Sequence, residues 1–275
     1  MSFLHCGRFR LPLDQPLIMG IINVTPDSFS DGGVSASPRL AVDLAERLVA
    51  DGAHILDVGG ESTRPGAQPV GLQEELDRVL PVLEGLKGCT VPVSVDTYKP
   101  EVMRAAIAAG ASMVNDVNAL GAPGALEAVA ASDAGTCLMH MQGTPQTMQE
   151  NPRYEDVVAE VRDFLAGRVR AAERAGIGRE RIVADPGFGF GKKTEHNLAL
   201  LRHLDALQEL GVPLLVGLSR KSVLGGIARR DVAEERVYAS VAAALLAVAK
   251  GAAILRVHDV RATRDALAVW AAVRG

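Results

Sequence analysis

The stretch Ile182-Val-Ala-Asp-Pro-Gly-Phe-Gly-Phe-Gly191 decides how this sequence is interpreted. An apolar run of strand length ends in the carboxylate of Asp185, and three glycines then alternate with two phenylalanines. Glycine allows backbone conformations that other residues avoid, so such a loop can aim its aromatic rings at a flat ligand. Two lysines lead into the helical pattern of residues 194–201. The stretch predicts a buried strand opening onto a cationic, aromatic binding loop, with an ordinary strand-to-helix loop as the alternative.

Two common phosphate-binding motifs do not fit this loop. A Walker A motif requires glycine where Pro186 stands and serine or threonine where Lys193 stands. A G-x-G-x-x-G turn requires its last glycine at the position of Lys192. The loop therefore does not belong to either nucleotide-binding class.

Length and composition restrict the class of protein. The chain has 275 residues, the size of a single α/β barrel, and no linker or charge run divides it. A formal net charge of -4 argues against a nucleic-acid partner. No apolar segment is long enough to predict a membrane span, and the amino terminus lacks the apolar core of a signal peptide. Three scattered cysteines predict neither a disulfide framework nor a zinc site, so we expect a cytoplasmic protein.

Strand-like apolar runs alternate with helical patterns along the chain. The runs are continuous rather than alternating, which predicts parallel strands buried on both faces. About eight such units follow one another, which favours a (β/α)8 TIM barrel over an open doubly wound sheet. We predict one domain over residues 1–275, with a short amino-terminal hairpin between Phe3 and Leu13 that closes the bottom of the barrel.

Polar residues stand where these predicted strands end. Active sites of this barrel lie at the carboxyl ends of the strands, so a ring of polar side chains there predicts one site. The ring consists of Asn23, Asp57, Asp96, Asn115, His140, Asp185, Ser219 with Lys221, and Arg256 with His258.

The ring divides into two kinds of chemistry. Asp96, Asn115 and Asp185 offer mostly acceptors, which suit a flat heterocycle with N–H donors, such as a guanine or a similar ring. Arg256 and His258 lie two residues apart on the last strand and present cations suited to a diphosphate. Asp57 and Asp116 could equally anchor loops through hydrogen bonds to backbone N–H groups and are left out of the catalytic set, and His140 is left without a settled role.

Several motifs together resemble the dihydropteroate synthase family of pterin-binding barrels, over nearly the whole chain. They are Met19-Gly-Ile-Ile-Asn-Val-Thr-Pro-Asp-Ser-Phe-Ser-Asp-Gly-Gly33, Gly60-Glu-Ser-Thr-Arg-Pro-Gly66, Ser94-Val-Asp-Thr97, Val114-Asn-Asp-Val117, Met139-His-Met-Gln-Gly143, Asp185-Pro-Gly-Phe-Gly-Phe-Gly191, Leu218-Ser-Arg-Lys-Ser222 and Arg256-Val-His-Asp259. Tyr98 departs from the family's pattern, in which a small residue such as serine is expected.

The resemblance implies an activity and a set of site residues. The family condenses (7,8-dihydropterin-6-yl)methyl diphosphate with 4-aminobenzoate, giving 7,8-dihydropteroate and diphosphate in folate biosynthesis. The residues implied at the pterin are Asp96, Asn115, Met139, Asp185, Phe190 and Lys221. Those implied at the diphosphate are Thr63, Arg256 and His258, together with Asn23 through Mg²⁺. Those implied at the aminobenzoate, where sulfonamides bind in this family, are Phe29, Arg64, Pro65, Phe190 and Ser219.

The family mechanism is dissociative, with diphosphate leaving before the aryl amine attacks a pterin methylene cation. The residues implied in catalysis are Asp96, Asp185, Lys221, Arg256 and His258. Two alternatives stay open, a pterin-dependent methyltransferase and a non-catalytic pterin-binding paralogue. The resemblance also implies a homodimer, to which the apolar stretch Val237 to Ala249 would contribute unless it is buried inside the monomer.

Overall fold

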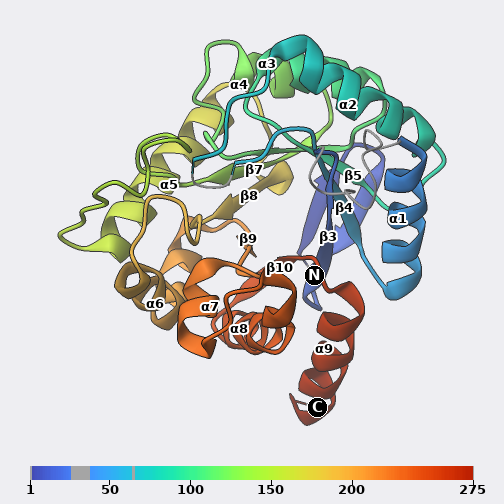
Figure 1. Ribbon diagram of the computed structural model, residues 1–275. Coiled ribbons are helices and arrows are strands. Elements are labelled where there is room, and N and C mark those ends of the chain that lie inside the picture. The colour runs from blue at the N-terminus through green and yellow to red at the C-terminus, as the bar shows by residue number, and fades with distance from the viewer. Residues whose placement is uncertain (1, 26–37, 64–65, 275) are drawn as a thin grey trace.

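The computed structural model describes residues 2–25, 38–63 and 66–274. Eight parallel strands close into a barrel in the order β10-β3-β4-β5-β6-β7-β8-β9 (Figure 1). The strands are β3 Leu17–Asn23, β4 Ile55–Gly59, β5 Val93–Asp96, β6 Met113–Asp116, β7 Gly135–Met139, β8 Ile182–Asp185, β9 Leu214–Val216 and β10 Ala252–Val257. The predicted (β/α)8 TIM barrel is confirmed, and the open doubly wound sheet is excluded by the closure between β10 and β3.

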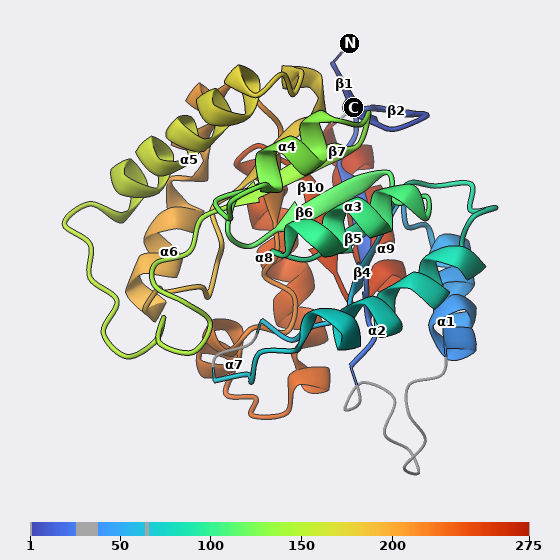
Figure 2. The same cartoon turned by 90° about the horizontal axis from the view of Figure 1, so that it is seen from above.

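Helices cover the outside of the barrel (Figures 1 and 2). They are α1 Pro38–Asp51, α2 Leu72–Gly85, α3 Pro100–Ala108, α4 Ala125–Ala130, α5 Val157–Arg174, α6 Thr194–Arg202, α7 Ser222–Ala228, α8 Val237–Ala249 and α9 Val260–Arg274. Short 3-10 helices span Arg179–Arg181, Leu204–Leu210 and Ala233–Arg236. Among the described residues, no helix combines the length and apolar character needed to cross a bilayer.

Each strand is buried on both faces, as its continuous apolar sequence predicts. Alternate side chains point into the barrel, where Met19, Ile55, Met113 and Val183 belong to one inner cluster. The intervening side chains, such as Ile22, pack outward against the helices. Both layers exclude water from the strands, so side chains can meet solvent or a ligand mainly beyond the strand ends.

The amino-terminal hairpin closes one end of the barrel. Strands β1 Phe3–Cys6 and β2 Phe9–Pro12 pair in antiparallel fashion, and Leu4 and Cys6 are fully buried in the inner cluster. A β-carbon on Gly135, at the start of β7, would lie 2.8 Å from the Cys6 sulfur, so glycine makes room for the hairpin there. Figure 2 shows the hairpin at the opposite end of the barrel from α7, which follows β9. The predicted hairpin is confirmed, and it leaves the carboxyl ends of the strands as the open end.

Candidate active site

Strand register brings four residues into one row at the open end of the barrel. Asn23 of β3 pairs with Gly59 of β4, Gly59 with Asp96 of β5, and Asp96 with Asn115 of β6. Residues that pair across a parallel sheet point to the same side. A β-carbon on Gly59 would lie 3.8 Å from Asp96 Oδ2 and 3.9 Å from Asn23 Oδ1, so both oxygens face the space above this glycine.

Arg256 of β10 reaches into this row and joins two carboxylates. Its Nε donates to Asp57 Oδ2 at 2.6 Å, and its Nη2 donates to Asp96 Oδ2 at 2.7 Å. Asn115 Nδ2 donates to the same Asp57 oxygen at 3.1 Å. Asp57 stands two residues before Gly59 on β4, so its side chain points to the same side one layer deeper. Because Gly59 has no side chain, the guanidinium of Arg256 can reach the Asp57 carboxylate below it.

Asp57 therefore belongs to the site, and of the two possibilities the loop anchor is excluded, because its carboxylate accepts from Arg256 and Asn115. Its side chain is fully buried, and among the described residues its Oδ1 has no hydrogen-bond partner. The signal was available in the sequence, because Asp57 lies inside the strand rather than after it. Asp116 does serve as a loop anchor, since its carboxylate accepts from the backbone N–H groups of Asn118 and Leu120 at 2.7 Å each.

Burial and charge act against each other in this cluster. Burial raises the pKa of Asp96 to about 7, while the Arg256 guanidinium acts to lower it. Burial lowers the pKa of Arg256, but Asp57 and Asp96 outweigh it and raise that pKa above its ordinary value. Charge-assisted hydrogen bonds of this length favour the ionised pair. Arg256 thus stays cationic at the barrel mouth. Its side chain extends from the last strand to the row formed by Asn23, Gly59, Asp96 and Asn115.

Asp185 and Lys221 form the opposite side of the mouth. Asp185 is buried, and its Oδ1 accepts from the backbone N–H of Gly187 at 2.7 Å. Burial raises the pKa of Asp185, whereas the charges of Lys221 and Arg256 are among those that lower it. Asp185 thus lies within electrostatic reach of both Lys221 and Arg256.

Lys221 lies against the aromatic loop after β8. Its Nζ donates to the Phe188 carbonyl and lies 4.5 Å from the centroid of the Phe190 ring. Burial lowers the pKa of Lys221 to about 8, although Asp185 acts to raise it. Met139, at the end of β7, pairs with Asp185 and is buried beside it. The structure thus brings together Asp185, Lys221, Phe190 and Met139, which the resemblance assigns to one ring-shaped ligand.

Ser219 and His258 meet at the ends of β9 and β10. The Ser219 hydroxyl accepts from the His258 backbone N–H at 3.2 Å and lies 3.0 Å from His258 Nδ1. A hydroxyl that accepts one hydrogen bond remains able to donate its own hydrogen, here to Nδ1. That arrangement leaves the N–H on Nε2 of the imidazole. The residues expected at the aminobenzoate and at the diphosphate are therefore in direct contact.

Arg220 fixes the turn between Ser219 and Lys221. It has a φ of 59°, a left-handed conformation that non-glycine residues seldom adopt. Its backbone N–H donates to Ser240 Oγ at 2.9 Å. Its guanidinium donates to Asp259 through Nε at 3.0 Å and through Nη2 at 2.6 Å. These contacts stabilise a strained turn that directs its two neighbours toward the site.

The loop after β4 is described only in part. Thr63 is half-buried, and Phe29, Arg64 and Pro65 lie outside the described residues. The base of this loop is held by Glu61, which accepts from the Tyr98 hydroxyl at 2.9 Å and forms an ion pair with Lys99. Tyr98, the departure from the family's pattern, thus contacts the loop that carries Thr63.

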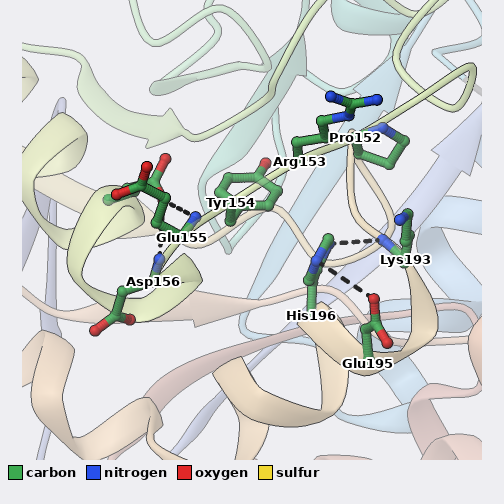
Figure 3. A pocket seen from close by; sticks show the side chains of 9 residues that line it. Pro152, Arg153, Tyr154, Glu155, Asp156, Lys193, Glu195 and His196 are labelled. Atoms are coloured by element: carbon green, nitrogen blue, oxygen red, sulfur yellow. Dashed lines mark hydrogen bonds and ion pairs between the residues drawn. The ribbon is translucent and has the colours of Figure 1, made fainter.

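A second hollow lies outside the barrel mouth. It is formed by the segment before α5 and the start of α6, and Tyr154, Lys193 and His196 line it (Figure 3). None of the predicted strand-end residues contributes to it. The candidate active site is therefore the cluster at the barrel mouth.

A barrel mouth that joins carboxylates, an amide and cations suits a flat heterocycle, and comparison with known proteins shows the class to be that of pterin-binding enzymes. The family described as pterin binding enzyme matches residues 19–258. Dihydropteroate synthase of Neisseria meningitidis serogroup B is 55% identical over 275 residues, which cover 98% of this chain and 96% of that protein. This chain belongs to the dihydropteroate synthase family.

Solved structures agree with this assignment over the full chain. Xanthomonas albilineans dihydropteroate synthase with 4-aminobenzoic acid has a TM-score of 0.94 and 57% identity, and covers 100% of this chain and 98% of that one. The X. albilineans enzyme in complex with 7,8-dihydropteroate has a TM-score of 0.91 and 53% identity, and covers 100% of this chain and 99% of that one.

Proposed function

We propose that this chain is a dihydropteroate synthase, a transferase that condenses (7,8-dihydropterin-6-yl)methyl diphosphate with 4-aminobenzoate to give 7,8-dihydropteroate and diphosphate in folate biosynthesis. The observation that carries the proposal is the contact of Arg256 with Asp96, because it joins the predicted ring-binding residues to the strand end that bears the phosphate-binding candidate His258. Neither alternative, a methyltransferase or a non-catalytic paralogue, is favoured, because relatives above 50% identity over nearly the full chain are dihydropteroate synthases.

The acceptor groups of the mouth suit the pterin ring. Asp185 and Asp96 can accept from its N–H groups, and Asn115 can either donate or accept. Lys221 can donate one of its other hydrogens to a ring carbonyl or nitrogen while it stays bonded to the Phe188 carbonyl. Met139 and Phe190 provide apolar and aromatic contact surface.

Cations and oxygen ligands near the last strand suit the diphosphate. Arg256 and the Nε2–H of His258 can donate to phosphate oxygens, with Thr63 on the adjoining loop. The half-buried Asn23 carboxamide fits Mg²⁺, which prefers oxygen ligands and completes its shell with water and substrate phosphates. When bound there, Mg²⁺ would neutralise charge on the leaving diphosphate.

The aminobenzoate would lie between Ser219 and the loop bearing Phe190. Phe29, Arg64 and Pro65, which the family resemblance also implies at this ligand, lie outside the described residues. The Ser219 hydroxyl can donate to a carboxylate once its hydrogen turns from His258 Nδ1, and the Phe190 ring can pack on the aryl ring. Sulfonamides resemble 4-aminobenzoate in shape and would compete for the same contacts.

A dissociative reaction is consistent with these charges. Arg256 and His258 stabilise negative charge that grows on the departing diphosphate. Asp96 and Asp185 lie beside the ring that becomes cationic, so their carboxylates stabilise the methylene cation. The aryl amine then attacks that carbon, and no nucleophilic side chain is required.

A homodimer is proposed from the surface of α8 and α9. Tyr238 is 89% exposed, Leu246 59%, Val269 66% and Val273 83%. Helix α8 buries mainly small residues against the barrel, and Tyr238 and Leu246 remain exposed. A second copy covering this face would bury them, and we place the dimer in the cytoplasm. Light scattering at micromolar concentration should give twice the chain mass, and the Leu246→Asp variant should give the monomer mass.

Genetic complementation tests the proposed activity. The chain should restore growth without added folate products to a bacterial strain whose own dihydropteroate synthase gene has been deleted. Variants Asp185→Asn and Arg256→Ala, expressed at equal levels, should not. Failure of the wild-type chain to support growth, when a known synthase does so in the same strain, would contradict the proposal.

A further inference from the structure

Lys192 is a buried cation that none of the steps above uses. Its side chain is 3% exposed. Its Nζ donates to the carbonyls of Gly187 and Phe190 at 2.9 Å each and to the His140 carbonyl at 3.3 Å, and lies 2.9 Å from His140 Nδ1. A buried ammonium is stable only where such acceptors replace water. All of these acceptors belong to the loop after β8 or to the segment directly after β7.

His140 is suited to be the side-chain acceptor of this group. Its backbone N–H donates to the Asp185 carbonyl at 3.0 Å, and its ring meets Phe164 edge-on, with 4.9 Å between centroids. Burial lowers the pKa of His140 to about 3, and Lys192 lowers it too. A neutral imidazole that accepts at Nδ1 carries its hydrogen on Nε2. His140, left without a role from the sequence, is thus a partner of Lys192.

The loop held by Lys192 has almost no room to move toward β7. A β-carbon on Gly187 would lie 1.9 Å from the His140 carbonyl oxygen, and one on Gly191 would lie 2.4 Å from that of Gln142. Both glycines have positive φ, at 66° and 60°. Glycine therefore permits a close approach that brings the loop carbonyls around the ammonium.

Two ammonium groups hold neighbouring carbonyls of this loop. Lys192 binds the carbonyls of Gly187 and Phe190 from the buried side, and Lys221 binds the carbonyl of Phe188 from the mouth. Burial lowers the pKa of Lys192 to about 7, while Asp185 raises it and Lys221 lowers it. The ring of acceptors favours the ammonium, because a neutral amine has fewer hydrogens to donate.

Further contacts secure the outer end of the same loop. The Tyr154 hydroxyl donates to the Gly191 carbonyl at 2.8 Å, and Gly189 N–H donates to Asn197 Oδ1 at 2.7 Å. Tyr154 also meets His196 edge-on beside the outer hollow, which Lys193 lines (Figure 3). Lys193 itself is exposed. Adjacent lysines thus differ completely in environment, which provides a matched control.

We propose that Lys192 is a positioning residue for the pterin site, and that it sets the placement of Lys221 and Phe190 by holding the loop between them and β7. The inference rests on the proposed function, because it assigns Lys192 to the pterin half of that site. Lys192 acts through Lys221: when the loop carbonyls lose their buried ammonium, the Phe188 carbonyl and the lysine bonded to it shift together.

A double-mutant cycle in pterin binding separates this role from a general contribution to stability. Calorimetry would measure the binding of a dihydropterin without diphosphate to folded wild type, Lys192→Met, Lys221→Ala and the double variant. We expect Lys192→Met to weaken binding about tenfold. The same change in the Lys221→Ala background should weaken it less than about twofold. Lys193→Met should bind like wild type.

The outcomes distinguish the two proposals. Equal loss from Lys192→Met in both backgrounds, or wild-type affinity of the folded variant, would contradict the positioning role alone. Failure of wild type to bind the pterin would contradict the proposed function instead. If Lys192→Met does not fold, His140→Leu removes one acceptor while keeping the ammonium. It should show the same coupling to Lys221, whereas His140→Gln, which keeps an acceptor, should bind close to wild type.

Discussion

Arg256 Nη2 donates to Asp96 Oδ2 at 2.7 Å, joining the last strand of the barrel to a strand 160 residues earlier in the chain. The same guanidinium holds the fully buried Asp57 at 2.6 Å. One cation therefore links the acceptor row to the last strand, where we propose that the diphosphate binds. The sequence assigns Arg256 to the diphosphate half of the site alone. In the structure its side chain also contacts Asp96, which is assigned to the pterin half.

Replacing Arg256 by Ala should damage both folding and catalysis. Breaking a buried ion pair leaves uncompensated charge, so we expect the free energy of unfolding to fall by about 3 kcal/mol in urea denaturation. Adding Asp57→Asn should restore part of that loss, because it removes one of the stranded charges. We also expect kcat/KM to fall at least about 100-fold. Wild-type stability in Arg256→Ala would show that the pair does not contribute as described.

Asp57→Asn should weaken activity more than stability, because its oxygen positions Arg256 and Asn115. We expect a fall of about tenfold in kcat/KM, the loss of one charge-assisted contact. Asp116→Asn is the matched control, since Asp116 is equally buried but bonds only its own loop. That variant should lower the unfolding free energy with little change in KM. Similar kinetics in the two variants would argue against a role for Asp57 in the site.

Asp259→Ala should impair aminobenzoate use through the turn at Arg220. Without its bidentate partner, the left-handed Arg220 is no longer held, and Ser219 loses its position beside His258. We expect KM for 4-aminobenzoate to rise about tenfold, measured at saturating pterin substrate. Glu234→Ala removes only an exposed contact 3.8 Å from Arg220 and should leave KM unchanged. A rise of the same size in both variants would show that the turn is not the cause.

His140 should make the protein less stable in acid. Its pKa is lowered to about 3 by burial, with Lys192 acting in the same direction, and unfolded histidine titrates near 6.5. Between these values the unfolded chain binds the extra proton, so the unfolding free energy falls as pH decreases, by up to about 1.4 kcal/mol per pH unit. His140→Gln should reduce this slope, and the exposed His203→Gln should not. Equal slopes in wild type and His140→Gln would refute the assignment.

The sequence predicts the barrel well because its evidence is local. Continuous apolar runs mark buried strands, and polar residues directly after them mark the mouth. Strand register and closure are not local, so the reach of Arg256 across Gly59 to Asp57 could not be read from spacing. The face of α1 shows the same limit: a spacing of four residues puts Leu40 on one helical face with Leu44 and Leu48, yet Leu40 is 48% exposed. Ala41 and Ala45 are buried instead, because small side chains let the helix approach the strands.

The contact partners of a buried side chain also cannot be predicted from residue spacing. Because Lys192 follows a glycine-rich loop, its position in the sequence is typical of an exposed cation. Its hydrogen-bond partners nevertheless come from the loop itself and from the segment after β7. Its environment depends on three glycines with positive φ that fold the loop onto those acceptors. Such an environment becomes visible only when the backbone path is known.

The most direct measurement is the stoichiometry of diphosphate and 7,8-dihydropteroate in one reaction of the purified protein with Mg²⁺, the pterin diphosphate and 4-aminobenzoate. The account predicts one diphosphate for each dihydropteroate, and no dihydropteroate when either substrate is omitted. Absence of dihydropteroate from the complete mixture, or diphosphate release that continues over many turnovers without 4-aminobenzoate, would contradict it.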